Sequence, residues 1–322
     1  KCQSLDYCRF PSLLPRINES TFENCVLLNN LSISGSITSI ENNAFNGCSS
    51  LEYIFINPSV KTIGNYAFAG CKSLEFVSMS NNIKRIGKGA FSGCISLSKI
   101  SIPKSLKKIS KYAFKGCTLL KEIEIPECIN KIGKYSFAEC TSLTTITISS
   151  SLILKEGAFN GCSSLAQIQF ENDQMYNIIK IGKYCFAKCN SLSEISIPES
   201  VKSISDGSFT GCSSLRKITM SSSVVKIGKF AFSKCPSLAT VSLSSSLIVI
   251  NEATFEDCVS LKEIKIPSSV KFIGNKAFHG CLSLSKVDIN SDIKICNDTF
   301  SECPALMKPE NENNSNADCC IF

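Results

Sequence analysis

The sequence predicts an α/β repeat solenoid with a parallel sheet, built from about 13 units of about 23 residues. Phe-x-x-Cys recurs from Phe22/Cys25 to Phe300/Cys303, and successive Phe lie 23 residues apart in nine intervals, 22 in two and 27 in one. The chain is 43% apolar and 19% charged, which supplies enough apolar side chains for a continuous core. We therefore expect residues 1–303 to form one elongated domain in place of two globular ones.

The unit that ends at Phe114 shows each expected element in order. Its Leu-x-x-Ile-x-Ile segment, residues 97–102, alternates apolar and polar side chains as a short strand does. Pro103 follows at the strand end, where a residue without an N–H is tolerated. Leu106 and Ile109 begin the return path, and Ala113–Phe114 closes the coil, for which we expect one helical or 3₁₀ turn.

Stacked units share one core, because a single unit cannot bury its apolar face alone. Equivalent strands then pair in parallel at about 4.8 Å, which gives an array about 65 Å long. Gly precedes the repeated Cys in seven units, which predicts a turn residue with positive φ. The 27-residue interval holds four extra residues near 171–177, which we interpret as a neutral surface loop in preference to a contact site.

Fourteen of the 20 cysteines, counting Cys2, occupy one repeat position and should form a column. Buried, reduced thiols are favoured for this column, with disulfides and metal ligation as the alternatives. Pairwise disulfides would imply a two-unit period that is not seen, and a zinc site lacks Cys-x-x-Cys spacing. Four further cysteines are interpreted as ordinary variation within the array, and the last two lie beyond it: Cys8, Cys128, Cys185, Cys296, then Cys319 and Cys320.

The unit from Leu261 to Cys281 reads Leu-x-x-Ile-x-Ile-Pro-x-Ser-Val-x-x-Ile-Gly-x-x-Ala-Phe-x-Gly-Cys. It resembles the BspA-like, or Treponema pallidum type, leucine-rich repeat, and the resemblance covers residues 1–303. The resemblance implies a curved array with the parallel sheet on its concave face. It also implies a binding role, since members of this family are commonly surface or secreted proteins of bacteria and protists that take part in adhesion to host or matrix proteins.

Both ends of the chain suggest further features. Residues 2–5 match residues 71–74, and their partner Phe would precede residue 1, so we expect the array to begin inside a repeat. Residues 304–318 form a polar, Asn- and Glu-rich segment, expected to be a flexible linker. The last four residues, 319–322, fit a prenylation box in which Cys319 carries a geranylgeranyl chain, although a four-residue pattern also arises by coincidence.

The outward side chains of the strands are the candidate protein-binding residues on the concave face. Aromatic side chains dominate the early units and charged ones the later units, so we expect a protein partner here, with ordinary surface scatter or cover by a missing segment as the alternatives. The candidates are Tyr53, Phe55, Phe76, Lys121, Glu122, Glu124, Glu194, Arg216, Lys217, Lys262, Glu263 and Lys265. Lysines also recur two positions before the repeated Ile, and we interpret them as a solvated face in preference to a lipid patch: Lys61, Lys84, Lys107, Lys202 and Lys271.

Catalytic chemistry has little support in the sequence. The single His, His279, lies in a variable turn position, and no nucleotide-binding glycine motif occurs, so we expect no enzyme activity, no cofactor, no metal and no small-molecule substrate. Lysines far outnumber arginines and are spread along the repeat, which argues against nucleic-acid recognition. We expect a lipid-tethered adhesion or recognition protein at the plasma membrane, exposed at the cell surface; the alternative is an intracellular scaffold or regulatory subunit at the cytosolic face of a membrane.

Overall fold

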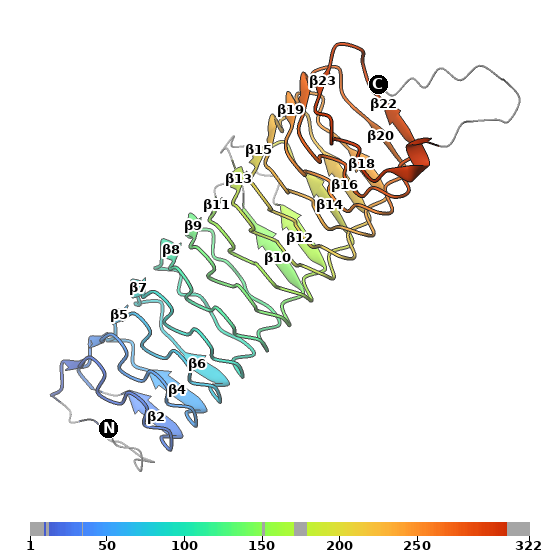
Figure 1. Cartoon of the computed structure of the whole chain (residues 1–322). Helices are drawn as coiled ribbons and strands as arrows, with labels where there is room; N and C mark the ends of the chain where they lie inside the picture. Colours follow the sequence, from blue (N-terminus) through green and yellow to red (C-terminus); the bar gives the residue numbers. More distant parts are fainter. Residues whose placement is uncertain (1–9, 11–12, 34, 150–151, 171–178, 308–322) are drawn as a thin grey trace, which may run out of the picture.

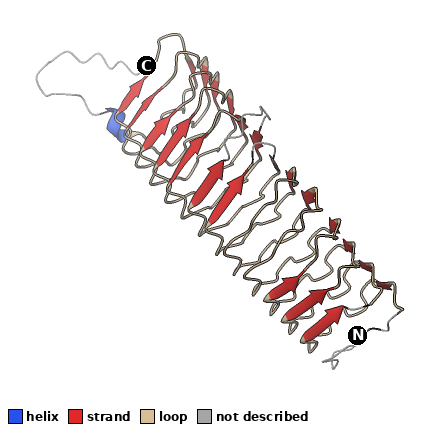
Figure 2. Cartoon of the chain, turned by 180° about the vertical axis from the view of Figure 1, so that it is seen from behind, coloured by secondary structure: helices blue, strands red, loops and turns tan. Residues whose placement is uncertain are grey.

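The computed structural model describes residues 10, 13–33, 35–149, 152–170 and 179–307. The chain winds into an elongated solenoid whose coils follow one another in sequence order (Figure 1). Two rows of parallel strands run along opposite sides of the solenoid, and turns connect them (Figures 1 and 2). The predicted repeat solenoid and its parallel sheet are therefore confirmed.

The first row, here called the strand row, is formed by the Leu-x-x-Ile-x-Ile segments. Its side chains alternate between the core and an outward surface that we call the strand face, as in β4, where Ile54 and Ile56 are buried and Tyr53 and Phe55 are exposed. The strands pair in parallel without a shift in register, as Leu31 does with Ile54. The row consists of β2 (Asn30–Ile33), β4 (Tyr53–Ile56), β6 (Phe76–Ser78), β10 (Thr145–Ile148), β12 (Gln167–Phe170), β14 (Glu194–Ile197), β16 (Lys217–Met220), β18 (Thr240–Ser242), β20 (Glu263–Lys265) and β22 (Lys286–Asp288).

The second row, here called the ladder row, lies on the return path of each coil. Most of its strands have only two residues, an outward one followed by a buried Ile. We call its outward surface the ladder face. The row consists of β1 (Arg16–Ile17), β3 (Ser39–Ile40), β5 (Thr62–Ile63), β7 (Arg85–Ile86), β8 (Lys108–Ile109), β9 (Lys131–Ile132), β11 (Ile153–Leu154), β13 (Ile179–Ile181), β15 (Val201–Ile204), β17 (Lys226–Ile227), β19 (Val249–Ile250), β21 (Phe272–Ile273) and β23 (Lys294–Ile295).

The coil closes at the repeated Phe through linked turns, and the expected helical turn there is wrong. In one coil the N–H of Lys115 donates to the carbonyl of Tyr112 at 3.1 Å, and the N–H of Cys117 donates to the carbonyl of Phe114 at 3.2 Å. Tyr112 and Gly116 have φ of +60° and +74°, and such left-handed residues end each turn before a helix can propagate. Within the described ranges the one helix is the 3₁₀ segment η1 (Pro304–Met307).

The core consists of columns of identical side chains from successive coils. Phe rings from Phe22 to Phe300 stack nearly parallel, with centroids 5.1 to 5.7 Å apart. The repeated Cys is buried in every described coil, which confirms the column that the sequence predicts. Each thiol from Cys48 onward donates a hydrogen bond to the carbonyl of the Phe in the preceding coil, as Cys94 Sγ does to Phe68 O at 3.1 Å. The column is therefore hydrogen-bonded as well as apolar.

The solenoid is nearly straight, although the family resemblance implies a curved array (Figure 1). Curvature requires neighbouring coils to lie farther apart on one side than on the other. Here main-chain hydrogen bonds join successive coils in both strand rows and also at the Phe turns, where the N–H of Phe45 donates to the carbonyl of Ala67 at 2.7 Å. Within each block the rise per coil is consequently close to equal on the bonded sides, and the array has little curvature.

The two strand rows are interrupted at the same three places. The ladder row divides into the sheets β1-β3-β5-β7, β8-β9-β11, β13-β15-β17 and β19-β21-β23, and the strand row divides at the last two of these junctions as well. At the first junction the segments 98–102 and 121–125 lack strand assignment, with one isolated bridge from Phe76 to Lys99. The Phe rings remain stacked across all three junctions, with ring centroids 5.7, 5.5 and 5.6 Å apart. The solenoid therefore consists of four blocks of three or four coils joined through the Phe side.

Candidate protein-binding surface

All twelve candidate residues of the strand face are exposed in the structure, as the period-2 alternation predicts. Nine of them stand at the two outward positions of the strand row. The other three, Lys121, Arg216 and Lys262, precede those positions at the edge of the face. The structure therefore brings the candidates together on one side of the solenoid, as a band that extends from β4 to β20.

An aromatic cluster occupies the strand face of β4 and β6. Tyr53, Phe55 and Phe76 are 39%, 54% and 46% exposed. Tyr53 pairs in register with Phe76, and the rings of Phe55 and Phe76 lie 6.1 Å apart at an interplanar angle of 57°. The Tyr53 hydroxyl donates to Glu75 Oε2 at 3.4 Å, and this carboxylate raises the pKa of Tyr53. Three contiguous exposed aromatics form an apolar anchor of the kind that protein interfaces concentrate.

Charged side chains of both signs occupy the later coils of the strand face. Glu194 lies opposite Lys217, and Glu263 lies opposite Lys286 on the paired strand. Cross-strand pairs of opposite charge stabilise a sheet modestly and leave little net charge on the face. Glu122, in a segment without strand assignment, forms an ion pair with Lys99 at 2.9 Å, and the lysine lowers the pKa of this carboxyl. This part of the face offers mixed-charge contacts instead of an apolar anchor.

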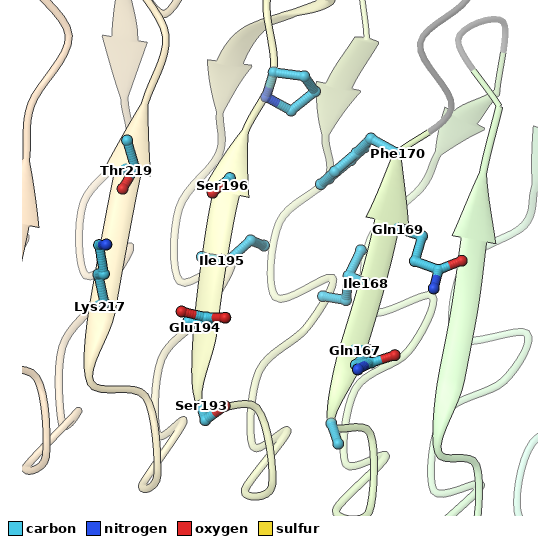
Figure 3. Close-up of a pocket in the computed structure, with 12 residues that line it drawn as sticks. Gln167, Ile168, Gln169, Phe170, Ser193, Glu194, Ile195, Ser196, Lys217 and Thr219 are labelled. Carbon is cyan, nitrogen blue, oxygen red and sulfur yellow. The ribbon is translucent and has the colours of Figure 1, made fainter.

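An open groove of about 690 Å³ interrupts the strand face between β12 and β14 (Figure 3). Gln167 stands on one wall and Glu194 on the other. Ile168 and Phe170 are only half-buried here, whereas Ile146 and the other inward residues of β10 and β14 are buried. The groove coincides with the second block junction, since β12 and β14 belong to separate sheets. Sequence reasoning did not predict it, although the 27-residue interval marks the same coil.

The remaining predicted features have no cluster of reactive groups around them. His279 Nδ1 lies 2.8 Å from Ser301 Oγ, and its Nε2 lies 3.9 Å from Glu302. Among the described residues, no group of three His, Cys, Asp or Glu side chains is placed to hold a metal ion. Within the same residues, no helix has the length and apolarity to cross a membrane. Residues 308–318 of the predicted linker and the lipidation residue Cys319 lie outside the described residues, as do residues 1–9 with the expected repeat fragment.

Comparison with known families and structures identifies the class of protein that this fold defines. The BspA type leucine-rich repeat region matches residues 1–98, 84–178 and 179–307, so the chain belongs to this family. A leucine-rich repeat protein from Bacteroides ovatus is 30% identical, with a TM-score of 0.70 over 89% of this chain and 82% of that one. A leucine-rich cell surface protein from Faecalibacterium prausnitzii is 28% identical, with a TM-score of 0.55 over 86% of both chains. No curated protein matches the chain.

Proposed function

We propose that this chain is a non-enzymatic recognition protein that binds another protein through its strand face. We further propose that a prenyl group on Cys319 tethers it to the plasma membrane and that its role is adhesion to a host or matrix protein. Membership of a leucine-rich repeat family supports protein binding or adhesion in general. The Faecalibacterium prausnitzii relative is a cell surface protein, and this supports a surface location for the present chain.

The aromatic cluster of Tyr53, Phe55 and Phe76 is the observation that carries the protein-binding proposal. Its rings stand on paired strands, and the contact between the Phe55 and Phe76 rings restricts their rotamers, which lowers the side-chain entropy lost on binding. Polar side chains surround it, such as Asn30 on β2 and Ser78 on β6. A fixed apolar centre with a polar rim is the usual arrangement of an interface hot spot.

Replacement of the cluster tests this proposal. The variant with Tyr53→Ser, Phe55→Ser and Phe76→Ser should lose at least about tenfold in affinity for a matrix protein such as fibronectin or laminin, since hot-spot aromatics contribute about 2 kcal/mol or more each. Surface plasmon resonance with the immobilised variant measures the loss. The inward residues of β4 and β6 are untouched, so circular dichroism should show an unchanged fold.

A matched control replaces outward polar residues of two distant coils, Thr219→Ser on β16 and Thr240→Ser with Ser242→Ala on β18, and should bind as the natural chain does. Equal binding by the cluster variant and the natural chain would show that the aromatic cluster is not part of the binding site. Binding to neither matrix protein by the natural chain would count against the adhesion role and leave the cluster to be tested on other partners.

The tether has its own experiment, because residue 319 can be changed without touching the array. Exchange of Cys319 for Ser prevents prenyl transfer and should shift the protein from the membrane fraction to the soluble fraction of its own cells. The Cys320→Ser variant keeps the modified thiol and is the natural comparison. Unchanged membrane recovery after the Cys319 exchange would count against lipidation.

The thiol column favours a second candidate function, a scaffold at the cytosolic face of a membrane. The column cysteines donate hydrogen bonds as reduced thiols, and thiols persist in reducing compartments. Labelling of intact cells with an impermeant reagent separates the two candidates. Modification of surface lysines supports adhesion, and complete protection supports the scaffold.

A further inference from the structure

The ladder face carries charged side chains of one sign, all of them basic. It is formed mainly by the two residues that precede the apolar residue at the end of each ladder strand; Leu152, at one of these positions, is buried instead. Of these positions along the thirteen strands, twelve hold Lys or Arg and none holds Asp or Glu. The basic residues are Arg16, Lys61, Lys84, Arg85, Lys107, Lys108, Lys131, Lys180, Lys202, Lys226, Lys271 and Lys294. Since the whole chain has a net charge of +7, the rest of the molecule is net negative.

None of these twelve basic side chains forms an ion pair within the part of the chain that the structure describes. The ion-paired lysines of the described chain are six others, namely Lys99, Lys115, Lys134, Lys183, Lys229 and Lys265. Three of those six lie just beyond the ladder strands and contact an acid of the next coil at 2.7 Å, as Lys229 contacts Glu252. These three lysines, two residues after a ladder strand, are therefore neutralised by an acid of the next coil, whereas the lysines on the ladder face itself have no salt bridge among the described residues.

The charge is densest in the two coils that contain β7 and β8. Lys84 and Arg85 stand beside Lys107 and Lys108 in the next coil, and all four are exposed. The nearest acids in sequence after them are Glu122 and Glu124 on the opposite strand face and Glu127 in the turn between the two rows. The two pairs lie on opposite sides of the first block junction, where β7 and β8 are not paired, and like charges in neighbouring coils repel one another. Binding to an anionic surface relieves this repulsion.

Apolar side chains of the same face indicate which anionic surface it fits. Ile153, Val225 and Ile248 occupy ladder-face positions and are 47%, 47% and 53% exposed. A face that combines basic and exposed aliphatic side chains suits the boundary between lipid headgroups and acyl chains. A soluble polyanion would contact the lysines but gain little from the aliphatic groups. Lysines outnumber arginines on the face ten to two, which favours unspecific attraction by point charges over bidentate recognition.

We propose that the ladder face docks on an anionic lipid bilayer, with its basic side chains against acidic phospholipid headgroups. The solenoid is straight, and its two strand rows lie on opposite sides (Figure 1), so a docked array lies along the membrane with the strand face turned to the water. This docking extends the proposed membrane tether, because a single prenyl chain needs a second signal for stable anchoring. Acidic phospholipids concentrate in the cytoplasmic leaflet, so the docking favours the second candidate function, the scaffold at the cytosolic face. It also replaces the interpretation of the lysine columns as a merely solvated face.

Vesicle binding by the unmodified chain tests this docking separately from the tether. Protein made in bacteria carries no prenyl group, so the result is independent of Cys319. We expect about tenfold or more binding to vesicles that contain phosphatidylserine over vesicles of phosphatidylcholine alone, measured by co-sedimentation. The binding should fall steeply as salt shortens the screening length. Equal binding to both kinds of vesicle, or binding to neither, would overturn the docking and leave the tether proposal intact.

Charge reversal on the face locates the binding. The variant with Lys84→Glu, Arg85→Glu, Lys107→Glu and Lys108→Glu should lose at least about tenfold of its vesicle binding, because each removed basic residue weakens attraction to the surface. All four side chains are exposed, so circular dichroism should report a natural fold.

The matched control reverses four exposed lysines of the strand face and changes the net charge by the same amount: Lys217→Glu, Lys262→Glu, Lys265→Glu and Lys286→Glu. It should bind vesicles within about twofold of the natural chain, since these positions point away from a docked bilayer. An equal loss in both variants would show that net charge alone governs binding and would refute the docking face.

Replacement of the exposed aliphatic residues distinguishes a bilayer from a soluble polyanion. Ile153→Ser together with Ile248→Ser should weaken binding to phosphatidylserine vesicles several-fold and leave binding to heparin unchanged. Tight heparin binding with no vesicle binding would assign the face to a polyanion and reject the lipid proposal.

Discussion

Each coil from the Phe22 turn to the Phe278 turn contains two left-handed residues, four positions apart, and only one of the two positions follows a sequence rule. The position before the repeated Cys holds Gly in seven coils, as expected for positive φ, but also adopts φ of +56° at Lys234 and +62° at Glu139. The earlier position is left-handed at Tyr66 and Tyr135 as well. A left-handed residue with a side chain costs about 1–2 kcal/mol relative to the right-handed region. The array therefore contains local strain that its inter-coil hydrogen bonds hold in place.

Replacement of Lys234 by Gly should stabilise the array by about 1 kcal/mol, because glycine adopts positive φ without steric cost, less the entropy it adds to the unfolded chain. The midpoint of urea unfolding measures the change. Gly93→Ala is the converse, and should destabilise by a similar amount. Gly93 has φ of +73°, and an added Cβ would lie 3.7 Å from its nearest neighbour, so the backbone conformation and not crowding sets the effect. A stabilised Gly93→Ala variant would contradict this account.

The side chains of the candidate site are predictable from the sequence because alternation fixes which way each residue of a strand points. The same alternation predicts that Tyr53, Phe55 and Phe76 share one face, and their exposure on β4 and β6 agrees with it. The ladder row is not predictable, since a two-residue strand such as β5 shows no alternation to detect. Nor is the groove beside Gln167, because it depends on the separation of two coils and on no single residue.

At the scale of the element, the cysteine column links stability to pH. Burial raises the pKa of the column thiols Cys48, Cys117 and Cys235 to about 12, and that of the other column thiols from Cys71 onward in the same direction. An unfolded thiol titrates near 8.5, so between these two values the native state holds more protons than the unfolded state. Stability is therefore fully present below about pH 8.5 and falls as the pH rises toward 12.

We expect the array to lose about 1.4 kcal/mol per pH unit for each buried thiol that its cooperative unit exposes. Urea midpoints at about pH 7.5, 9 and 10 measure the slope. The Cys117→Ala variant should be less stable at all pH values, because it leaves a small cavity. Its loss of stability per pH unit should be smaller by the contribution of one thiol, about 1.4 kcal/mol. The same slope in both proteins would show that tyrosine or lysine titration, and not the column, causes the alkaline loss. Native thiols should also resist alkylation, since the thiolate is the reactive form.

At the scale of the whole molecule, the Phe turns and the strand rows hold successive coils together at different places. The Phe turns are hydrogen-bonded across every block junction, as in the bond from the Phe159 N–H to the Cys185 carbonyl at 2.9 Å. The strand rows are joined only within blocks. Ring stacking at 5.1 to 5.7 Å exceeds the strand spacing of about 4.8 Å, and offset rings absorb part of this difference. We infer that the remaining mismatch accumulates over three or four coils and is released at a junction.

Hydrogen exchange should therefore divide the solenoid into four blocks. Repeat proteins unfold in units set by their weakest interfaces, and the junctions β7/β8, β12/β14 and β18/β20 have the fewest inter-coil bonds. Peptides that cover β14 and β20 should exchange about tenfold or more faster than those covering β16, which is paired on both sides. The turn peptides around Phe159 and Phe186 should stay protected at the same junction, because their bonds persist. Uniform protection along the array would mean that the solenoid opens as one unit and that the three block junctions are not weaker than the other interfaces between coils.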